Sequence, residues 1–118
     1  MLILGIETSC DDTSVALVDC SENGCFVVSE KTASQIDLHK IYGGVVPELA
    51  GRLHAEAIVP LIEHVLSEAK KNLESSQTTS TKNSSPIANT KFLVPDLIAV
   101  TAGPGLVTGL IVGVEAAR

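Results

Sequence analysis

Aromatic residues are nearly absent from the sequence. The 118 residues include no Trp, one Tyr and two Phe. Leu, Ile, Val and Ala must therefore fill any core, and stacking of nucleic-acid bases on aromatic rings is not expected. Basic residues are also scarce, because 8 Lys and Arg stand against 14 Asp and Glu, for a net charge of −6. A polyanionic partner would have to meet a local basic patch or another chain.

Long hydrophobic runs are missing as well. The longest uncharged apolar run, Leu106 to Val114, has nine residues and ends at Glu115, whereas a membrane-spanning helix needs about 20. The chain begins Met-Leu-Ile-Leu-Gly, without the basic flank and cleavage site of a signal peptide. We therefore expect no membrane association and a cytoplasmic location.

Cysteine is limited to three residues, an odd count. Together with the missing signal peptide, this count favours free thiols in a reducing compartment. Cys20 and Cys25 flank the sequence Ser-Glu-Asn-Gly and are placed to face each other across a hairpin. A disulfide between them is the less favoured alternative.

Three short apolar, β-branched runs open the chain and predict an antiparallel three-stranded meander. They are Leu2 to Ile6, Ser14 to Cys20 and Cys25 to Ser34, and turn-forming residues separate them. A helix should follow a loop, because Pro47 suits a first helical position. Apolar residues then recur every four positions from Leu49 to Leu73, which is a helical period.

The remaining elements complete an α/β fold with a mixed sheet. Pro60 interrupts the helical pattern, so we expect a kink, or two helices that meet near Val59. Leu97 to Thr101 predicts a buried strand, and Leu106 to Arg118 predicts a second helix. Three glycines stand four apart, a spacing typical of a helix packed closely on a sheet: Gly105, Gly109 and Gly113. We expect one domain over residues 1–118.

The segment Glu74 to Lys91 differs from the rest in composition. It has nine Ser or Thr among eighteen residues and almost no apolar content. Such a segment cannot bury enough surface to offset its ordering entropy. We expect a disordered insertion on the surface.

Two turns that follow apolar strands have the composition that phosphate recognition requires. Small residues and hydroxyls leave backbone N–H groups free to point at an anion. The candidate phosphate-binding residues are Thr8, Ser9, Cys10 and Thr13 in the first turn, and Ala102, Gly103, Pro104 and Gly105 in the second. No P-loop sequence occurs, and GPGLVTG matches a dinucleotide fingerprint only with one residue too many.

Three acidic residues and a thiol lie in or beside the first turn. Asp11 and Asp12 are adjacent, so at most one should point at a site, and a solvated turn with local hydrogen bonds is an equal alternative. Glu7 ends an apolar strand and should meet a cation, a metal-bound water or a hydrogen-bond donor. Cys10 is a weak candidate nucleophile, because no His lies near it in sequence.

The three histidines lack the close spacing of metal ligands. His64 is interpreted as a surface or interface residue of the helix. His54, near the helix start, is interpreted as a residue that orients a loop. No metal site is expected in this chain.

Three stretches, in this order and spacing, resemble the amino-terminal part of one family: GIETSCDDTSVALVD, LHKIYGGVVPELAGRLH and TAGPGLVTGLIVG. The family is TsaD, the tRNA threonylcarbamoyltransferases. The resemblance implies the amino-terminal lobe of a two-lobed, actin-like ATPase fold of the ASKHA, ribonuclease H-like type. It also implies transfer of a threonylcarbamoyl group from threonylcarbamoyl-adenylate to the adenosine beside the tRNA anticodon.

The resemblance also sets expectations for cofactors and partners. Asp11 and Asp12 would have supporting roles in catalysis, and an iron or zinc ion would act as Lewis acid in the full-length protein. The family's metal ligands lie beyond the position of Arg118, so residues 1–118 alone should be inactive. A TsaB-like paralogue and a TsaE-like ATPase are implied partners, and the complete protein would bind tRNA.

A non-catalytic association module of the TsaB type is the alternative interpretation. The helical stripe from Leu49 to Leu73 is relevant to this alternative. Its apolar side chains form two neighbouring columns, and this apolar face is wider than packing against a sheet requires. We expect this face to pair with the partner, or with a second copy when no partner is present. The other interpretation is that both columns are core. Four residues lead the columns: Leu61, Ile62, Val65 and Leu66.

Overall fold

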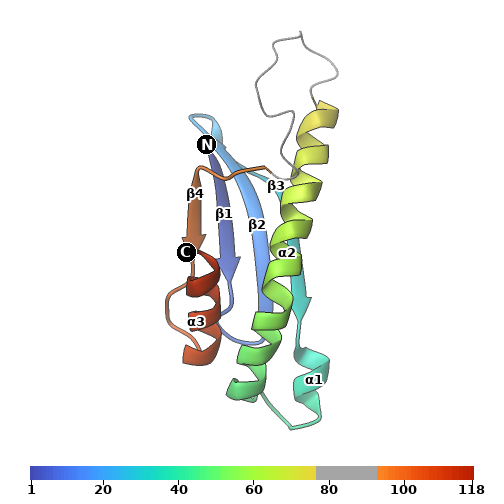
Figure 1. The fold of residues 1–118 in the computed structure, drawn as a ribbon, viewed down its shortest axis with the longest axis vertical. Coiled ribbons are helices and arrows are strands. Elements are labelled where there is room, and N and C mark those ends of the chain that lie inside the picture. Colours follow the sequence, from blue (N-terminus) through green and yellow to red (C-terminus); the bar gives the residue numbers. More distant parts are fainter. Residues whose placement is uncertain (77–92) are drawn as a thin grey trace.

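A four-stranded sheet with two helices on one face forms the body of the protein. The computed structural model describes residues 1–76 and 93–118. The elements, in chain order, are β1 (Leu2–Glu7), β2 (Asp12–Ser21), β3 (Gly24–Ser34), α1 (Ile36–Lys40), α2 (Pro47–Ser76), β4 (Leu97–Val100) and α3 (Val107–Ala116). Figure 1 shows α2 and α3 side by side in front of the sheet, and α1 at its lower end.

The strand order is β3-β2-β1-β4, and the sheet is mixed. β1 pairs with β2, and β2 with β3, in antiparallel fashion, whereas β1 and β4 are parallel. The predicted meander and the existence of the later strand are thus confirmed, with strand ends that differ by a few residues. The prediction that the later strand is buried was wrong, because β4 lies at the edge of the sheet and its side chains at Leu97 and Ile98 are exposed. Because β1 and β4 are parallel, their carboxyl ends lie at the same edge of the sheet.

The core is aliphatic, as the composition requires. Period-two alternation in β1 and β2 turns one set of side chains toward the helices. The fully enclosed members of the core include Leu17 and Val15 from the sheet and Val65 and Ala69 from α2. At about 25 cal/mol per Å² of buried apolar surface, this layer supplies the main drive for folding.

Helix α2 is one continuous element of 30 residues with Pro60 inside it. Of the two outcomes expected at Pro60, the alternative of two helices that meet near Val59 was therefore wrong. The ring of Pro60 lies on the exposed side of the helix, while Ile58 and Leu61 on either side of it are buried in the core. Packing on both sides of Pro60 offsets the one backbone hydrogen bond that it removes.

The structure differs from the prediction at the end of α2 and in the presence of α1. Helix α2 runs to Ser76, so Glu74–Ser76 are helical and not part of a loop. The rest of the predicted insertion lies outside the described residues. The short helix α1 was not predicted, because five residues are too few to show a helical period in the sequence.

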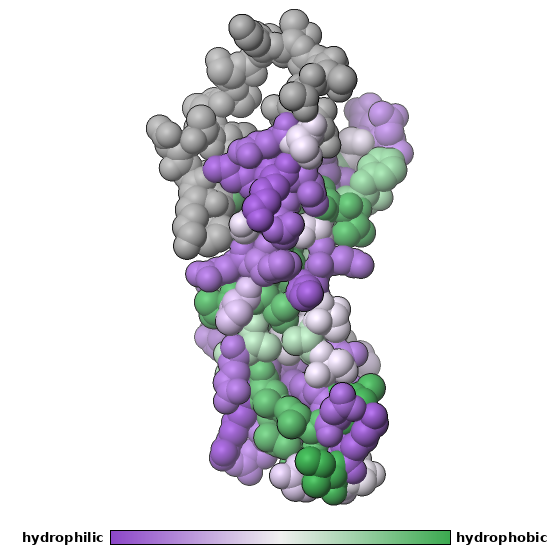
Figure 2. Space-filling model, turned by 90° about the vertical axis from the view of Figure 1, so that its right-hand side faces the viewer, coloured by the Kyte–Doolittle hydropathy of each residue, from purple (hydrophilic) through white to green (hydrophobic). Residues whose placement is uncertain are grey.

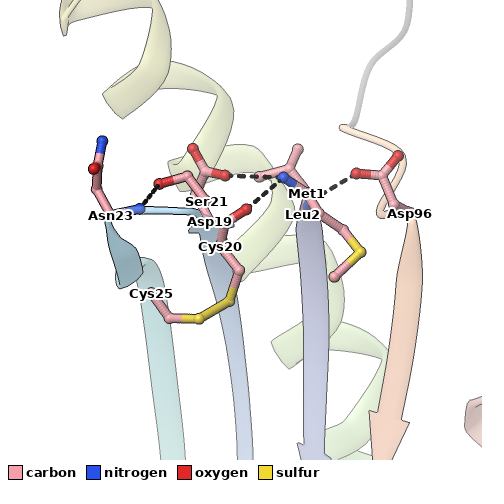
Figure 3. Close-up of a disulfide and its surroundings, with 8 residues drawn as sticks. All are labelled: Met1, Leu2, Asp19, Cys20, Ser21, Asn23, Cys25 and Asp96. Carbon is pink, nitrogen blue, oxygen red and sulfur yellow. Dashed lines mark hydrogen bonds and ion pairs between the residues drawn. A yellow bond between two sulfur atoms is a disulfide. The ribbon is translucent and has the colours of Figure 1, made fainter.

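Cys20 and Cys25 form a disulfide, which contradicts the expectation of free thiols. The two residues are direct partners in the register of β2 and β3, with Cα atoms 4.1 Å apart. Figure 3 shows the bond beside the amino terminus, whose ammonium group donates to the Cys20 carbonyl and pairs with Asp19. The expectation of free thiols rested on the predicted reducing compartment. The register of the hairpin instead places the two sulfur atoms within bonding distance. Cys10 is a free thiol.

Helix α3 packs on β1 through two glycines, as their spacing predicts. Gly109 and Gly113 are both buried. A Cβ at Gly109 would clash with the Thr8 carbonyl oxygen, and one at Gly113 would clash with the Thr8 hydroxyl. Only hydrogen in place of a side chain permits this approach. Within residues 1–76 and 93–118, none of the helices combines the length and apolar character that crossing a bilayer takes.

We expect Gly109→Ala to lower the free energy of unfolding by about 1 to 3 kcal/mol, the usual cost of overpacking. The added methyl group meets backbone at Thr8, which cannot rotate away. Gly44→Ala is the matched control, because a Cβ there meets nothing within 4 Å. Urea unfolding measures both variants. A Gly109→Ala protein as stable as Gly44→Ala would show that α3 is not held at this distance.

Candidate functional site

The two turns that sequence analysis identified separately lie against each other. The first follows β1 and the second follows β4, and these parallel strands end at the same sheet edge. The backbone N–H of Leu106 donates to the Ser9 carbonyl at 2.7 Å. A Cβ at Gly105 would clash with Ser9, whereas at Gly103 it would meet nothing within 4 Å. The second turn is therefore packed on the first at Gly105 and open at Gly103.

Glu7 ties the two turns together at their base. One carboxylate oxygen accepts from the Ser9 backbone N–H at 2.6 Å, and the other accepts a short hydrogen bond from the Thr101 hydroxyl. The predicted need of Glu7 for a hydrogen-bond donor is confirmed, with two donors from different turns. Burial by itself raises the pKa of Glu7, but the hydrogen bonds from Ser9 and Thr101 outweigh it and hold the pKa below its ordinary value.

Thr8 and Thr13 mark the two ends of the first turn, and both side chains are fully buried. The Thr8 hydroxyl donates to the Gly109 carbonyl at 2.9 Å, and the Thr13 hydroxyl shares a hydrogen bond with His54. These hydroxyls are therefore engaged within the protein. Phosphate binding by this turn stays a prediction, and it would have to use backbone N–H groups rather than these two side chains.

His54 connects helix α2 to the first turn. Its side chain is fully buried, with Nδ1 2.7 Å from the Thr13 hydroxyl and Nε2 3.1 Å from the Cys10 carbonyl. His54 therefore contacts the first turn, and its role in orienting that loop stays a prediction. His64 is exposed, as expected for a surface position.

Asp11 and Asp12 face different surroundings. Asp11 lines a cavity of about 410 Å³ together with residues of α1 and of the α1–α2 connection: Ile36, His39, Lys40, Gly43, Gly44 and Val45. Asp12 instead has its Oδ1 atom buried without a hydrogen-bond partner. Of the two carboxylates, Asp11 is the one placed beside an open space that a ligand can enter.

The surroundings of Cys10 disfavour nucleophilic chemistry. Its thiol is exposed, but partial burial and the neighbouring Asp11 and Asp12 carboxylates raise its pKa. A raised pKa lowers the fraction of thiolate, which is the reactive form. His54 contacts the backbone of Cys10 and not its sulfur.

His39 is the site residue that sequence reasoning did not place. It is buried, its Nε2 lies 2.9 Å from Gln35 Oε1, and its Nδ1 accepts from the Val46 backbone N–H at 3.3 Å. His39 thus holds α1 against the start of α2.

The cavity beside Asp11 has an apolar rim. Figure 2 shows apolar surface gathered at the lower end of the molecule, where α1 lies. The exposed apolar side chains there are Ile36, Leu38, Ile41, Tyr42 and Val45. In the part of the chain that the structure describes, no three His, Cys, Asp or Glu side chains gather as a metal site would need.

The lowered pKa of Glu7 predicts a specific pH dependence. A carboxylate with a depressed pKa in the folded state stabilises the fold above its ordinary value of 4.5, and this contribution is lost as the pH falls through the depressed value. Glu7→Gln should lack this part of the acid sensitivity. Glu22→Gln, at the exposed β2–β3 turn, is the control.

Urea unfolding at several pH values tests this expectation. The stability difference between wild type and Glu7→Gln should be largest near neutral pH and should shrink below pH 4.5. A difference that stays constant with pH would contradict the proposed bridge from Glu7 to Ser9 and Thr101.

Comparison with known proteins identifies relatives of the chain. The family model described as tRNA N6-adenosine threonylcarbamoyltransferase, TsaD, matches residues 26–118. Proteins of that name are 44% identical over 118 residues in Protochlamydia amoebophila, 43% over 118 residues in Dictyoglomus turgidum and 45% over 117 residues in Bacillus anthracis. These matches cover 99 to 100% of this chain but only 28 to 29% of each relative.

A solved structure, YeaZ from Pseudomonas aeruginosa, has a similar fold. It superposes with a TM-score of 0.53 at 23% identity, over 98% of this chain and 36% of that one. This likeness confirms the predicted α/β lobe of the actin-like ATPase type. The family match over most of the chain, and relatives aligned along its whole length, show that the chain belongs to the TsaD family of tRNA N6-adenosine threonylcarbamoyltransferases.

Proposed function

We propose that this chain forms one lobe of an enzyme that transfers a threonylcarbamoyl group from threonylcarbamoyl-adenylate to the adenosine beside the tRNA anticodon. The names of the relatives support the reaction. Because the chain spans about three-tenths of their length, the activity is proposed for the complete protein. Residues 1–118 are proposed to supply half of the binding cleft.

One observation carries this proposal: two small-residue turns interlock at the carboxyl ends of two parallel strands. Ligands of open α/β sheets bind beyond the carboxyl ends of the strands. The Ser9 backbone N–H donates to the Glu7 carboxylate, and the Ser9 carbonyl accepts from the Leu106 backbone N–H. The open space at Gly103 lets an adenylate phosphate approach the backbone.

The chain's own residues have two roles in this proposal. The backbone of the first turn binds the anionic phosphate, and Asp11 beside the cavity orients the polar part of the substrate. Iron or zinc is proposed as a Lewis acid of the complete protein. Residues 1–76 and 93–118 bring together no ligand set for it, and we propose that its ligands lie in the rest of the complete protein.

The partners and location follow from the proposed reaction. The net charge of −6 leaves tRNA binding to other parts of the complete protein. A TsaB-like paralogue and a TsaE-like ATPase are proposed partners. Because tRNA is modified where it is used, we propose a cytoplasmic location. Because Cys20 and Cys25 form a disulfide, the cysteines do not support this location, and only the proposed substrate does.

We also propose that the outer surface of the α2–α3 layer mediates association. Leu61 and Val65 of the predicted stripe are buried, and Ile62 and Leu66 are partly buried against the core. Much of the stripe therefore serves folding. The apolar side chains left exposed on this layer are Val59 at 58%, Val107 at 69% and Ile111 at 56%.

Asp11→Ala in the complete protein should lower the transferase rate by about one to three orders of magnitude, the range expected for loss of one positioned polar group. Asp12→Ala should lower it less, because Asp12 does not line the cavity. Asp19→Ala, at the far end of β2, is the control. The assay measures modified adenosine formed from threonylcarbamoyl-adenylate and tRNA. Equal rates for the Asp11 and Asp19 variants would remove Asp11 from the site, and activity of residues 1–118 alone would overturn the one-lobe proposal.

Val59→Glu and Ile111→Glu should weaken self-association and binding to a TsaB-like partner while leaving the melting temperature near wild type, since both side chains are exposed. Light scattering over a concentration series measures the mass of wild type and variants. Glu63→Gln, also exposed on α2, is the control. A wild-type chain that stays monomeric and does not bind the TsaB-like partner would contradict the proposed interface.

A further inference from the structure

We propose that His54 is a positioning residue that sets the direction of the peptide groups in the first turn, through its hydrogen bond to the Cys10 carbonyl. The kinetic part of this inference rests on the proposed function. Its structural part concerns the shape of the turn and can be tested without any activity.

Three successive carbonyl groups of the turn are held from three different elements. The Ser9 carbonyl accepts from the backbone N–H of Leu106 at 2.7 Å, and the Asp11 carbonyl accepts from the backbone N–H of Gln35 at 2.9 Å. Between them, the Cys10 carbonyl lies 3.1 Å from Nε2 of His54. The turn is thus fixed by the start of α3, by α2 and by the chain just after β3.

Peptide planarity converts these contacts into a direction for the N–H groups. In a trans peptide, the C=O of one residue and the N–H of the next point in opposite directions. Carbonyls of Ser9 and Cys10 that bond inward therefore turn the N–H groups of Cys10 and Asp11 outward. Outward N–H groups on neighbouring residues form the concave donor pair that binds anions.

The hydrogen bonds of His54 fix its tautomer. A carbonyl oxygen can only accept, so the contact to Cys10 requires the proton on Nε2. Nδ1 then accepts from the Thr13 hydroxyl at 2.7 Å. Both ring nitrogens are satisfied, which a fully buried imidazole requires.

Helix α3 keeps the ring in place. A Cβ at Gly109 would lie 3.0 Å from Cδ2 and 3.1 Å from Nε2 of His54. The ring edge therefore packs closely against α3. Of the three donors to the turn, Leu106 and Gln35 use backbone N–H groups, so His54 is the one whose contact a substitution can remove.

Two substitutions separate the two contacts of the ring. The amide of His54→Gln places its donor near the position of Nε2, so it can still reach the Cys10 carbonyl and loses the contact to Thr13. The shorter amide of His54→Asn lies near the position of Nδ1, so it keeps the contact to Thr13 and loses the one to Cys10. Both should lower the melting temperature by similar amounts, whereas only Asn releases the turn.

In the complete protein, we expect His54→Asn to raise the KM for threonylcarbamoyl-adenylate about tenfold. The KM of His54→Gln should stay close to that of the wild type. The matched controls are His64→Asn and His64→Gln, at an exposed position of the same helix. If the Asn and Gln variants lose activity equally, in step with their melting temperatures, His54 has a purely structural role and the inference is wrong.

Two measurements on residues 1–118 need no activity, so they stand even if the proposed reaction is not found. Nitrogen NMR of the wild type should show the proton of His54 on Nε2, and a proton on Nδ1 alone would overturn the inference. Alkylation of the free thiol of Cys10 by iodoacetamide should be several-fold faster in His54→Asn than in His54→Gln or wild type. Equal alkylation rates in folded proteins would show that His54 does not hold the turn.

Discussion

The close approach of α3 to the end of β1 is the constraint on which the site depends. Gly109 and Gly113 let the helix backbone reach Thr8, and the Thr8 hydroxyl in turn bonds to the Gly109 carbonyl. The same approach brings the N–H of Leu106 to the Ser9 carbonyl and packs α3 against the ring of His54. A wider spacing would break each of these contacts, because hydrogen bonds weaken steeply with distance.

Several polar residues in and beside the first turn form hydrogen bonds with residues far away in the sequence. Glu7 and Thr101 are separated by 94 residues, and Thr13 and His54 by 41. Each pair joins a turn to another element, so these side chains are satisfied and help to fix the turn. The contacts explain the Glu7 carboxylate and the Thr13 hydroxyl at the two ends of this short connection, whereas Asp12 keeps a buried oxygen without a partner.

Local patterns in the sequence were enough to predict the meander, the helical stripe and the two turns. Period-two and period-four apolar spacing follow from the geometry of one element, and so they can be seen in a short window. The contacts of Glu7, His54 and Asp11 depend on how distant elements pack, and no local window contains that information. The helix α1 was too short to predict, and continuous packing across Pro60 overrode a local rule for helix breaking.

The parallel pairing of β1 with β4 also has a consequence for the order of folding. The meander of β1, β2 and β3 closes through short connections, whereas β1 meets β4 only after about 90 residues of intervening chain. Contacts between distant residues form late, because the entropy of closing the loop must be overcome first. Thr101, Leu106 and Gly109 all follow β4, so their contacts with the first turn are expected to form after the meander. A partly folded chain can therefore possess the meander of β1, β2 and β3 and still lack the site.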